Sequence, residues 1–459
     1  MPSSVYFVGI GGIGMSAIAR HFHALGALVA GYDRTPSDIT RALEGEGICV
    51  SYADDPETVP SSFCDPGATL VVFTPAVPSD SRIMRFFREG GFRVVKRAVA
   101  LGELTRPFKT LCVAGTHGKT TTSTLAAHIL RQSAVGCSAF LGGVSVNYQT
   151  NYWGDTASGF VVTEADEYDR SFLQLEPTIA VITAMDADHL DIYGTHAEVI
   201  RAFLDFAAKV RPGGCLVVRY GLPIGREDVA PGVGLFTYSS HDVRADFHAE
   251  GVRVEGGRYV FDVVTPRETI AGVRLGIPGI HNVENCVAAV AMALAAGVPG
   301  RVLVEACASF RGNRRRFEVC VEGGAAMVID DYAHHPQEIE TTIRSVRALY
   351  PGRRLTVAFQ PHLYSRTRDL ADDFANALNM ADRVWLIDIY PAREKPIDGV
   401  TSEMLIGKMR DGLGRMSSRD ALADNIVSEE FDIVLVMGAG DIADLVPAVA
   451  DRVRGCMEA

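Results

Sequence analysis

The sequence predicts an α/β protein of three domains, each built on a mostly parallel sheet. Apolar runs alternate with helical patterns along almost the whole chain, which is typical of parallel strands joined by helices. The chain has 459 residues, enough for roughly three domains of ordinary size. Two apolar runs also end in glycine-rich loops that open a helix, an arrangement typical of nucleotide-binding sheets. We place the domain boundaries at 1–107, 108–312 and 313–459.

The composition fits a globular protein and excludes several classes. Hydrophobic residues make up 47% and charged residues 22% of the chain. A net charge of −12 argues against a general nucleic-acid surface, so an anionic substrate would need local clusters of positive charge. No secretory signal peptide is expected, and no apolar run approaches the roughly 20 residues of a membrane span. Nine scattered cysteines without a C-x-x-C pair indicate reduced thiols in a cytoplasmic protein.

The first glycine loop lies near the start of the chain. Gly9, Gly11 and Gly14 satisfy the G-x-G-x-x-G pattern after a strand, and Asp33 ends a second short strand. In dinucleotide-binding proteins these glycines admit a diphosphate and the carboxylate binds a ribose hydroxyl. The pattern leaves three explanations open: a nicotinamide or flavin site, a site for another diphosphate-bearing nucleotide, and a turn that serves packing alone.

The second loop follows the apolar run at residues 111–114. Its glycines would turn backbone N–H groups toward phosphate oxygens, Lys119 would contact the outer phosphates, and Thr120 would ligate Mg²⁺. The full P-loop pattern has glycine where this chain has Val113, so the loop is a shortened variant covering residues 115–120. The alternative is a glycine turn without a ligand. A nucleoside-triphosphate site is the better explanation because strand and helix both lie where the motif needs them.

Carboxylates and a histidine follow the next two predicted strands. Glu164 and Asp166 end one, and His189 follows the other. Because ligands collect outside the carboxyl ends of parallel strands, Glu164 and His189 are expected near Lys119 and Thr120. Oxygen ligands suit Mg²⁺, and a histidine completes a second site of mixed ligands. The alternative is that these residues are solvated strand-end or helix-start residues.

Three further polar clusters lie downstream. His281, Asn282 and Asn285 open a helix, where they either cap it or bind a base edge. Residues 311–316 form the densest cationic run, either a solvated surface or an anion clamp between domains. The strand ends of the last domain are dense in His, Tyr, Arg, Asp and Gly, which favours a binding rim over simple caps.

Taken in order, these motifs resemble the Mur ligases. The resemblance runs from about residue 5 to about 445, and the combination is more specific than any single motif. The motifs are the loops at residues 9–16 and 115–120, Thr163-Glu-Ala-Asp-Glu167, Asp188-His189, His281-Asn-x-x-Asn285, Arg315-Arg-Phe317, Asp331-Tyr-Ala-His-His-Pro336 and Gln360-Pro-His362.

The resemblance implies a Rossmann-like UDP-binding domain, a central P-loop ATPase-like mononucleotide-binding domain, and a Rossmann-like C-terminal domain that binds the amino acid. The alanine-adding branch is the nearest match. It implies joining of L-alanine to the lactyl carboxylate of UDP-N-acetylmuramic acid with ATP and Mg²⁺, through an acyl phosphate, in cytoplasmic peptidoglycan precursor synthesis. We expect a monomer or homodimer that binds no nucleic acid and no membrane.

The resemblance also implies roles for individual residues. The UDP-sugar would contact Gly11, Gly12, Gly14, Met15, Ser16 and Asp33. ATP would contact Gly115, Thr116, His117, Gly118, Lys119, Thr120, Thr121, His281, Asn282, Asn285, Arg316 and Asp330. The metals would bind Thr120, Glu164 and His189, and the amino acid Tyr332, His334 and Arg366. The residues nearest the chemistry would be Lys119, Glu164, His189 and His334, although no residue is identified as the base for the amine.

Some positions depart from the family pattern. Leu363 stands where the alanine ligases usually have Arg, so Arg366 would hold the amino-acid carboxylate alone or with Arg368. Tyr32 replaces a common Ser and Ala333 a frequent Gly. Sibling ligases use a carbamylated Lys that the stretch 199–208 lacks, as in the alanine branch. The alternatives are a muropeptide-recycling ligase, a sibling for another amino acid and, more distantly, a nicotinamide oxidoreductase or a UDP-sugar sensor.

Overall fold

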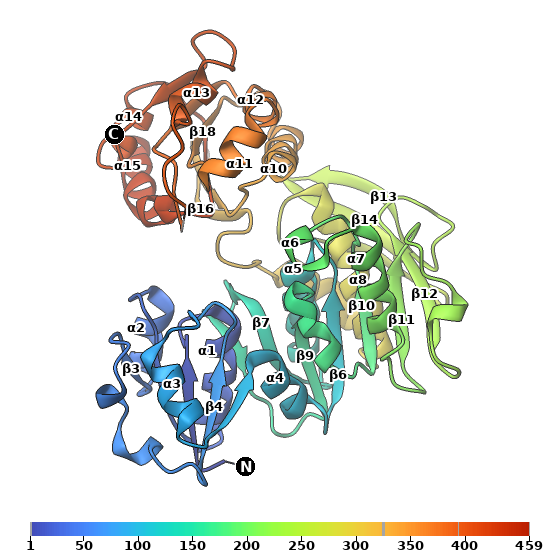
Figure 1. The fold of residues 1–459 in the computed structure, drawn as a ribbon. Coiled ribbons are helices and arrows are strands. Elements are labelled where there is room, and N and C mark those ends of the chain that lie inside the picture. Colours follow the sequence, from blue (N-terminus) through green and yellow to red (C-terminus); the bar gives the residue numbers. More distant parts are fainter. Residues whose placement is uncertain (1, 324–325, 393, 459) are drawn as a thin grey trace. The chain divides into compact units, whose positions relative to one another are not determined.

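The computed structural model describes residues 2–323, 326–392 and 394–458, and it contains three β-sheets flanked by helices (Figure 1). The α/β fold with three sheet-containing parts is therefore confirmed. The chain forms two compact units. The N-terminal unit comprises residues 1–252, 261–274 and 283–310, and the C-terminal unit comprises residues 253–260, 275–282 and 311–459.

The first sheet of the N-terminal unit is parallel, with strand order β3-β2-β1-β4-β5. The strand order reverses beside β1, which places the loop after β1 at a switch point where ligands of such sheets bind. The strands are β1 (Ser4–Val8), β2 (Leu28–Tyr32), β3 (Cys49–Ser51), β4 (Thr69–Phe73) and β5 (Arg93–Lys96). The helices are α1 (Ile13–Ala24), α2 (Asp38–Gly45), α3 (Arg82–Glu89), α4 (Arg97–Thr105) and the short 3₁₀ turns Pro56–Thr58 and Ser61–Phe63.

The second sheet has ten strands in the order β15-β14-β13-β12-β11-β10-β6-β9-β7-β8. Strand β6 pairs in parallel with β10 and β9, so the loops after these three strands share one edge of the sheet. The strands are β6 (Lys109–Ala114), β7 (Ser138–Ser145), β8 (Thr150–Trp153), β9 (Phe160–Ala165), β10 (Ile179–Ile182), β11 (Cys215–Arg219), β12 (Gly234–Ser239), β13 (Phe247–Glu255), β14 (Arg258–Val264) and β15 (Thr269–Arg274). The helices are α5 (Lys119–Arg131), α6 (Leu190–Tyr193), α7 (His196–Ala207), α8 (Ile280–Ala295), α9 (Gly300–Ser309) and the 3₁₀ segments Tyr168–Gln174 and Arg226–Asp228.

The third sheet belongs to the C-terminal unit and has the order β16-β17-β21-β18-β19-β20. Only β16 runs antiparallel to its neighbour among the pairs of this sheet. The strands are β16 (Glu318–Glu322), β17 (Met327–Asp331), β18 (Leu355–Phe359), β19 (Arg383–Leu386), β20 (Gly414–Met416) and β21 (Ile433–Met437). The helices are α10 (Pro336–Leu349), α11 (Tyr364–Asp369), α12 (Ala371–Leu378), α13 (Ser402–Ile406), α14 (Leu422–Val427), α15 (Val446–Glu458) and the 3₁₀ turn Asp441–Leu445.

Continuously apolar strands form the cores, as expected where both faces of a parallel sheet are covered. Every residue of β1, β10 and β21 is buried. Within the N-terminal unit, α1 packs against β7 and β8. The amide of Asn151 on β8 donates hydrogen bonds to the Ile13 carbonyl (2.6 Å) and the Ser16 hydroxyl (3.0 Å). This polar contact joins α1, the helix that follows the first strand, to the second sheet.

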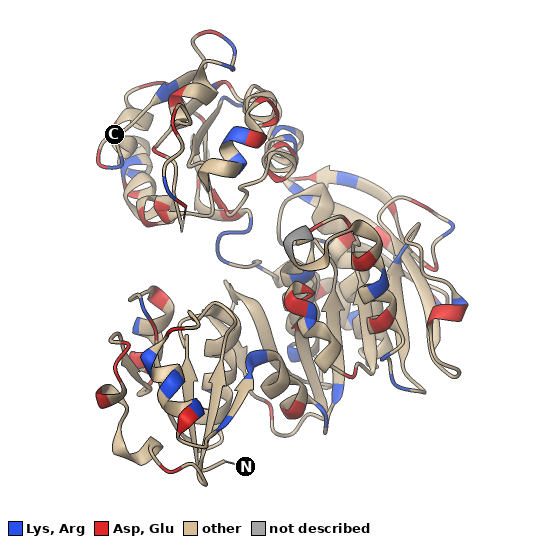
Figure 2. Cartoon of the chain, viewed as in Figure 1, with Lys and Arg blue, Asp and Glu red and all other residues tan. Residues whose placement is uncertain are grey.

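Residues of both charges occur throughout the chain. Figure 2, which colours Lys and Arg blue and Asp and Glu red, shows the two kinds interspersed over the helices and loops. Among the described residues, no helix is long and apolar enough to cross a bilayer.

Candidate active site

The loop between β6 and α5 has a backbone that only glycine adopts without strain. Gly115 has φ +137° and Gly118 has φ +80°. A Cβ atom on Gly115 would lie 2.0 Å from the Thr183 hydroxyl oxygen, and one on Gly118 would lie 2.6 Å from Asn285 Oδ1. The loop is thus closed tightly against the end of β10 and against α8. It opens α5, whose first N–H groups and positive helix end favour an anion.

Lys119 is held beside this loop by a buried carboxylate, Glu167, which the sequence analysis named in a motif without giving it a role. Its ammonium nitrogen lies 2.6 Å from the Gly115 carbonyl oxygen and 2.8–2.9 Å from the two oxygens of Glu167. The Glu167 side chain is only 1% exposed. Burial raises the pKa of Glu167, and the charge of Lys119 opposes that rise. Lys119 is therefore fixed beside the loop together with a buried counter-ion.

Thr120 and Glu164 face each other at the same sheet edge. The Thr120 hydroxyl donates to the Glu164 carboxylate at 3.0–3.1 Å. Gly142 on β7 makes room for that carboxylate, because a Cβ atom there would lie 1.8 Å from Glu164 Oε2. A hydroxyl and a carboxylate beside a phosphate loop are the oxygen ligands that Mg²⁺ prefers. The donor set fits the magnesium ion that the motifs imply.

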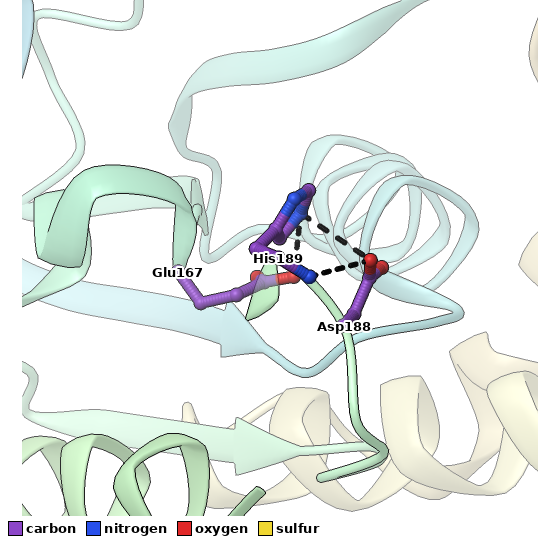
Figure 3. Close-up of side chains that lie close together, drawn as sticks. All are labelled: Glu167, Asp188 and His189. Atoms are coloured by element: carbon purple, nitrogen blue, oxygen red, sulfur yellow. Dashed lines mark hydrogen bonds and ion pairs between the residues drawn. The ribbon is translucent and has the colours of Figure 1, made fainter. Parts of the chain in front are cut away.

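His189 lies next to Glu167 and Asp188 (Figure 3). Its Nε2 atom is 3.9 Å from Glu167 Oε1 and 3.8 Å from Asp188 Oδ2, and one ligand atom from each residue falls within 4.8 Å of the others. The sequence analysis paired His189 with Glu164. The structure adds Glu167 and Asp188 as its immediate neighbours. One imidazole and two carboxylates form a donor set that suits a second divalent cation.

The remaining predicted ATP residues surround the loop to different degrees. The Thr116 hydroxyl accepts a hydrogen bond from the Asp186 N–H at 3.2 Å, and the exposed His117 has its Nε2 atom 3.8 Å from Asp186 Oδ2. Thr121 is half-buried in the first turn of α5. Asn285 accepts a hydrogen bond from the Thr122 hydroxyl at 3.3 Å, which fixes α8 against α5.

His281 and Asn282 lie in the first turn of α8 and belong to the C-terminal unit. The Asn282 side chain is buried, and its amide donates to the Pro278 carbonyl at 2.6 Å. His281 is exposed. This bond ties the first turn of α8 to the residue four positions before Asn282, and because the amide donates, it is not the N-cap bond in which a side-chain oxygen accepts a backbone N–H.

The N-terminal glycine loop is closed by Asp33. The Gly11 N–H donates to Asp33 Oδ2 at 2.8 Å, and Gly9 has φ +89°. Gly12 is the N-cap of α1. Met15 and Ser16 are buried. The Ser16 hydroxyl donates to the Ile13 carbonyl and accepts a hydrogen bond from the Asn151 amide. These two side chains therefore support the helix behind the loop.

In the C-terminal unit, Tyr332, His334 and His362 lie together. The His334 ring is 5.2 Å from the Tyr332 ring and 5.9 Å from the His362 ring, measured between centroids. Glu338 accepts the N–H groups of His334 (3.0 Å) and His335 (3.3 Å). Burial lowers the pKa of His334, and it lowers the pKa of His362 to about 4. Both imidazoles are therefore mainly neutral at pH 7.

Arg366 adds a cation to this group. Its Nη1 atom and the Nδ1 atom of His362 are buried without a hydrogen-bond partner among the described residues. Leu363 has φ +72° and donates its N–H to the Tyr390 carbonyl at 3.0 Å. Unsatisfied buried donors are costly, so they mark a place where a ligand acceptor is expected.

The sequence analysis assigned Arg316 and Asp330 to ATP and gave no role to Arg315, which is the arginine beside Asp330. Arg315 Nε lies 3.7 Å from Asp330 Oδ2, and the guanidinium groups of Arg315 and Arg316 both lie over the Tyr332 ring, at 5.1 and 5.3 Å. Burial raises the pKa of Asp330 to about 7, and Arg315 opposes that rise. Arg315 was missed because a run of adjacent arginines does not show which one turns inward.

Comparisons with known proteins cover nearly the whole chain. Family models match at residues 4–109 (Mur ligase family, catalytic domain), 113–293 (Mur ligase middle domain) and 315–440 (Mur ligase, glutamate ligase domain). The chain is 48% identical over 447 residues to a UDP-N-acetylmuramate–L-alanine ligase of Phocaeicola vulgatus, covering 97% of each protein. It is 50% identical over 443 residues to the Porphyromonas gingivalis protein of the same name, covering 96% of this chain and 97% of that one.

Solved structures give the same picture of the fold. The UDP-N-acetylmuramate-alanine ligase of Thermotoga maritima matches with a TM-score of 0.83 at 28% identity, covering 99% of each chain. A murein peptide ligase of Psychrobacter arcticus matches with a TM-score of 0.67 at 23% identity, covering 98% of each chain. The second likeness concerns the fold alone.

Proposed function

Because the chain belongs to the Mur ligase family, which confirms the resemblance read from its motifs, we propose that it joins L-alanine to UDP-N-acetylmuramic acid at the expense of ATP. Relatives with that name share 48% and 50% of their residues with this chain over nearly their full lengths. Both curated relatives are named for L-alanine, and the test below separates this reaction from those of the recycling and sibling ligases.

The observation that carries the proposal is the group of charged and hydroxyl side chains beside the loop that follows β6. Lys119, its buried partner Glu167 and the Thr120–Glu164 pair lie at one sheet edge. A nicotinamide enzyme or a UDP-sugar sensor would have no use for this group. A ligase that transfers a phosphoryl group needs such positioning and charge neutralisation around the outer phosphates.

The proposed reaction has two steps. A lactyl carboxylate oxygen of UDP-N-acetylmuramic acid attacks the γ-phosphorus of ATP, forming an acyl phosphate as ADP leaves. The amine of L-alanine then attacks the acyl carbon, inorganic phosphate leaves and the nitrogen loses a proton. Lys119 would stabilise charge on the transferring phosphoryl group. Bound at Thr120 and Glu164, and beside His189, Mg²⁺ would neutralise further negative charge.

The C-terminal unit would supply the amino acid. We propose that the unpartnered Nη1 atom of Arg366 binds the carboxylate of L-alanine, because a guanidinium and a carboxylate form a charge-assisted pair. Tyr332 and His334 would line the same place. The lowered pKa of His334 keeps its ring neutral, the form needed to accept a proton from the amine.

The three domains would then divide the work. We propose that residues 1–107 hold the UDP-sugar, residues 108–312 hold ATP and residues 313–459 bring the amino acid. The loop residues Gly11, Gly12 and Gly14 would approach the diphosphate, and Asp33 would bind a ribose hydroxyl. His281, Asn285 and the other predicted ATP residues would contact the nucleotide.

The test is phosphate release from ATP, measured with UDP-N-acetylmuramic acid and one candidate amine at a time. The candidates are L-alanine, L-serine, glycine, D-glutamate and the tripeptide that a recycling ligase would use. Release that requires the UDP-sugar and is highest with L-alanine supports the proposal. Highest release with the tripeptide or D-glutamate, or release that does not need the UDP-sugar, contradicts it.

A further inference from the structure

We propose that Arg97, the first residue of α4, is the cation that binds the diphosphate of the sugar nucleotide beside the N-terminal glycine loop. This inference rests on the proposed function, because that function puts a nucleoside diphosphate at this loop. What it adds is a specific ligand residue outside the glycine motif. Arg97 was not among the residues that the motifs assign to any site.

The position of the Arg97 side chain supports this role. A Cβ atom on Gly14 would lie 2.8 Å from Arg97 Nη1 and 3.2 Å from its Cδ atom. The guanidinium therefore lies directly against the first turn of α1, and Gly14 leaves the space that it occupies. The side chain is 20% exposed, so it is fixed by its surroundings yet open to a ligand.

The glycine loop has no cation of its own. Residues 9–16 contain neither lysine nor arginine, and the group that closes the loop is the carboxylate of Asp33. Backbone N–H groups and a helix end attract a diphosphate, but two phosphate charges call for a full positive charge nearby. A guanidinium meets this need well because its planar fork of donors matches phosphate oxygens.

Two helix starts lie beside the Arg97 guanidinium. The guanidinium lies against the start of α1, and Arg97 is itself the first residue of α4. Helix N-termini carry partial positive charge, so each repels a cation. Among the described residues, the ion pair of Arg97 is with Asp166, at 3.1 Å. A single half-exposed carboxylate leaves guanidinium donors available for phosphate oxygens.

The ion pair between Arg97 and Asp166 also relates the N-terminal loop to the central phosphate loop. Asp166 lies between Glu164 and Glu167, the two carboxylates beside the central phosphate loop. Arg97 therefore connects the N-terminal loop with the end of β9, which lies beside the central phosphate loop. A bound diphosphate would compete with Asp166 for the guanidinium, so weakening the Asp166 pair should favour the diphosphate.

The experiment compares UDP with uridine, which lacks the phosphates, in the full-length protein without ATP. Binding is followed by calorimetry for UDP and by ligand-observed NMR for uridine. We expect Arg97→Met to lower the affinity for UDP at least about tenfold and to leave the affinity for uridine unchanged. Arg97→Lys should fall between wild type and Arg97→Met, and Asp166→Asn should bind UDP at least as tightly as wild type.

Arg93→Met is the matched control, because Arg93 pairs with Glu103 on the surface of the same domain. Its UDP affinity should equal that of wild type. Equal losses of UDP and uridine affinity in Arg97→Met would show a purely structural role and overturn the inference, as would unchanged UDP affinity. If the wild-type protein shows alanine-dependent phosphate release but Arg97→Met binds UDP as tightly as wild type, only this inference fails. Absence of UDP binding by wild type refutes the proposed function as well.

Discussion

The two glycine loops of the N-terminal unit have the same plan and a different chemistry. Both follow a buried parallel strand, β1 or β6, and both open a helix, α1 or α5. Both are shaped by glycines whose Cβ atoms would clash with neighbours. In each case the strand, loop and helix present N–H groups to an anion.

The loops differ in where their charged groups come from. The central loop carries its own cation, Lys119, and that cation is already paired with a buried carboxylate, Glu167. The N-terminal loop carries no cation, and the carboxylate of Asp33 bonds to its Gly11 N–H. The guanidinium beside its Gly14 is that of Arg97, which comes from a helix that starts after β5. In the proposed function, the central loop would serve phosphoryl transfer and the N-terminal loop would hold a diphosphate that does not react.

The variant expected to show the largest effect of this difference is Lys119→Ala. Removing the cation within the central loop should lower kcat for phosphate release by at least about a hundredfold, because transition-state charge loses its main protein partner. UDP affinity should stay unchanged, since the N-terminal loop does not use Lys119. The measurement is a steady-state phosphate assay paired with UDP calorimetry.

The control for this variant is Lys109→Ala, at the exposed start of β6, whose ammonium lies over the Phe160 ring. It should keep wild-type turnover. Full turnover by Lys119→Ala would contradict the role given to the loop lysine.

A smaller effect is expected from Glu167→Gln. The amide still accepts a hydrogen bond from Lys119 but no longer neutralises it. Because the Glu167 side chain is only 1% exposed, the free energy of unfolding should fall by about 2 kcal/mol. Urea denaturation of the ligand-free protein measures this change.

Glu103→Gln provides the comparison, since its partner Arg93 is largely exposed and such surface pairs contribute about 0–1 kcal/mol. Equal stability losses in the two variants would show that the Lys119–Glu167 pair is no more important than a surface pair.

The difference between the loops also explains what the sequence could predict. The central loop is contiguous, so residues 115–120 and their flanking elements followed from the motif alone. Thr120, Glu164 and His189 could be assigned to one sheet edge because each lies at or just beyond the end of a predicted strand. The observed order β10-β6-β9 makes those strands neighbours. Periodicity therefore predicts which residues reach an edge.

Periodicity does not predict what happens beyond the strand end. Glu167 lies past the last residue of β9, before a segment where Asp169 and Arg170 have φ +53°. His189 has φ +51°, and the irregular backbone there decides that it meets Glu167 and Asp188. Arg97 is joined to the first loop only through tertiary packing. Side chains placed by such turns and contacts leave no pattern in a single sequence.

The smallest expected effect concerns Asp33, which closes the N-terminal loop. In Asp33→Ala the Gly11 N–H loses its acceptor, and the proposed ribose contact is lost with it. UDP affinity should fall about three- to tenfold, as for one or two ordinary hydrogen bonds. Asp33→Asn, which keeps an acceptor oxygen, should lose less. ADP affinity should be unchanged in both variants, because ADP would bind the central loop. A parallel loss of ADP and UDP affinity would mean that Asp33 supports the whole N-terminal unit, and the two loops would then not be independent sites.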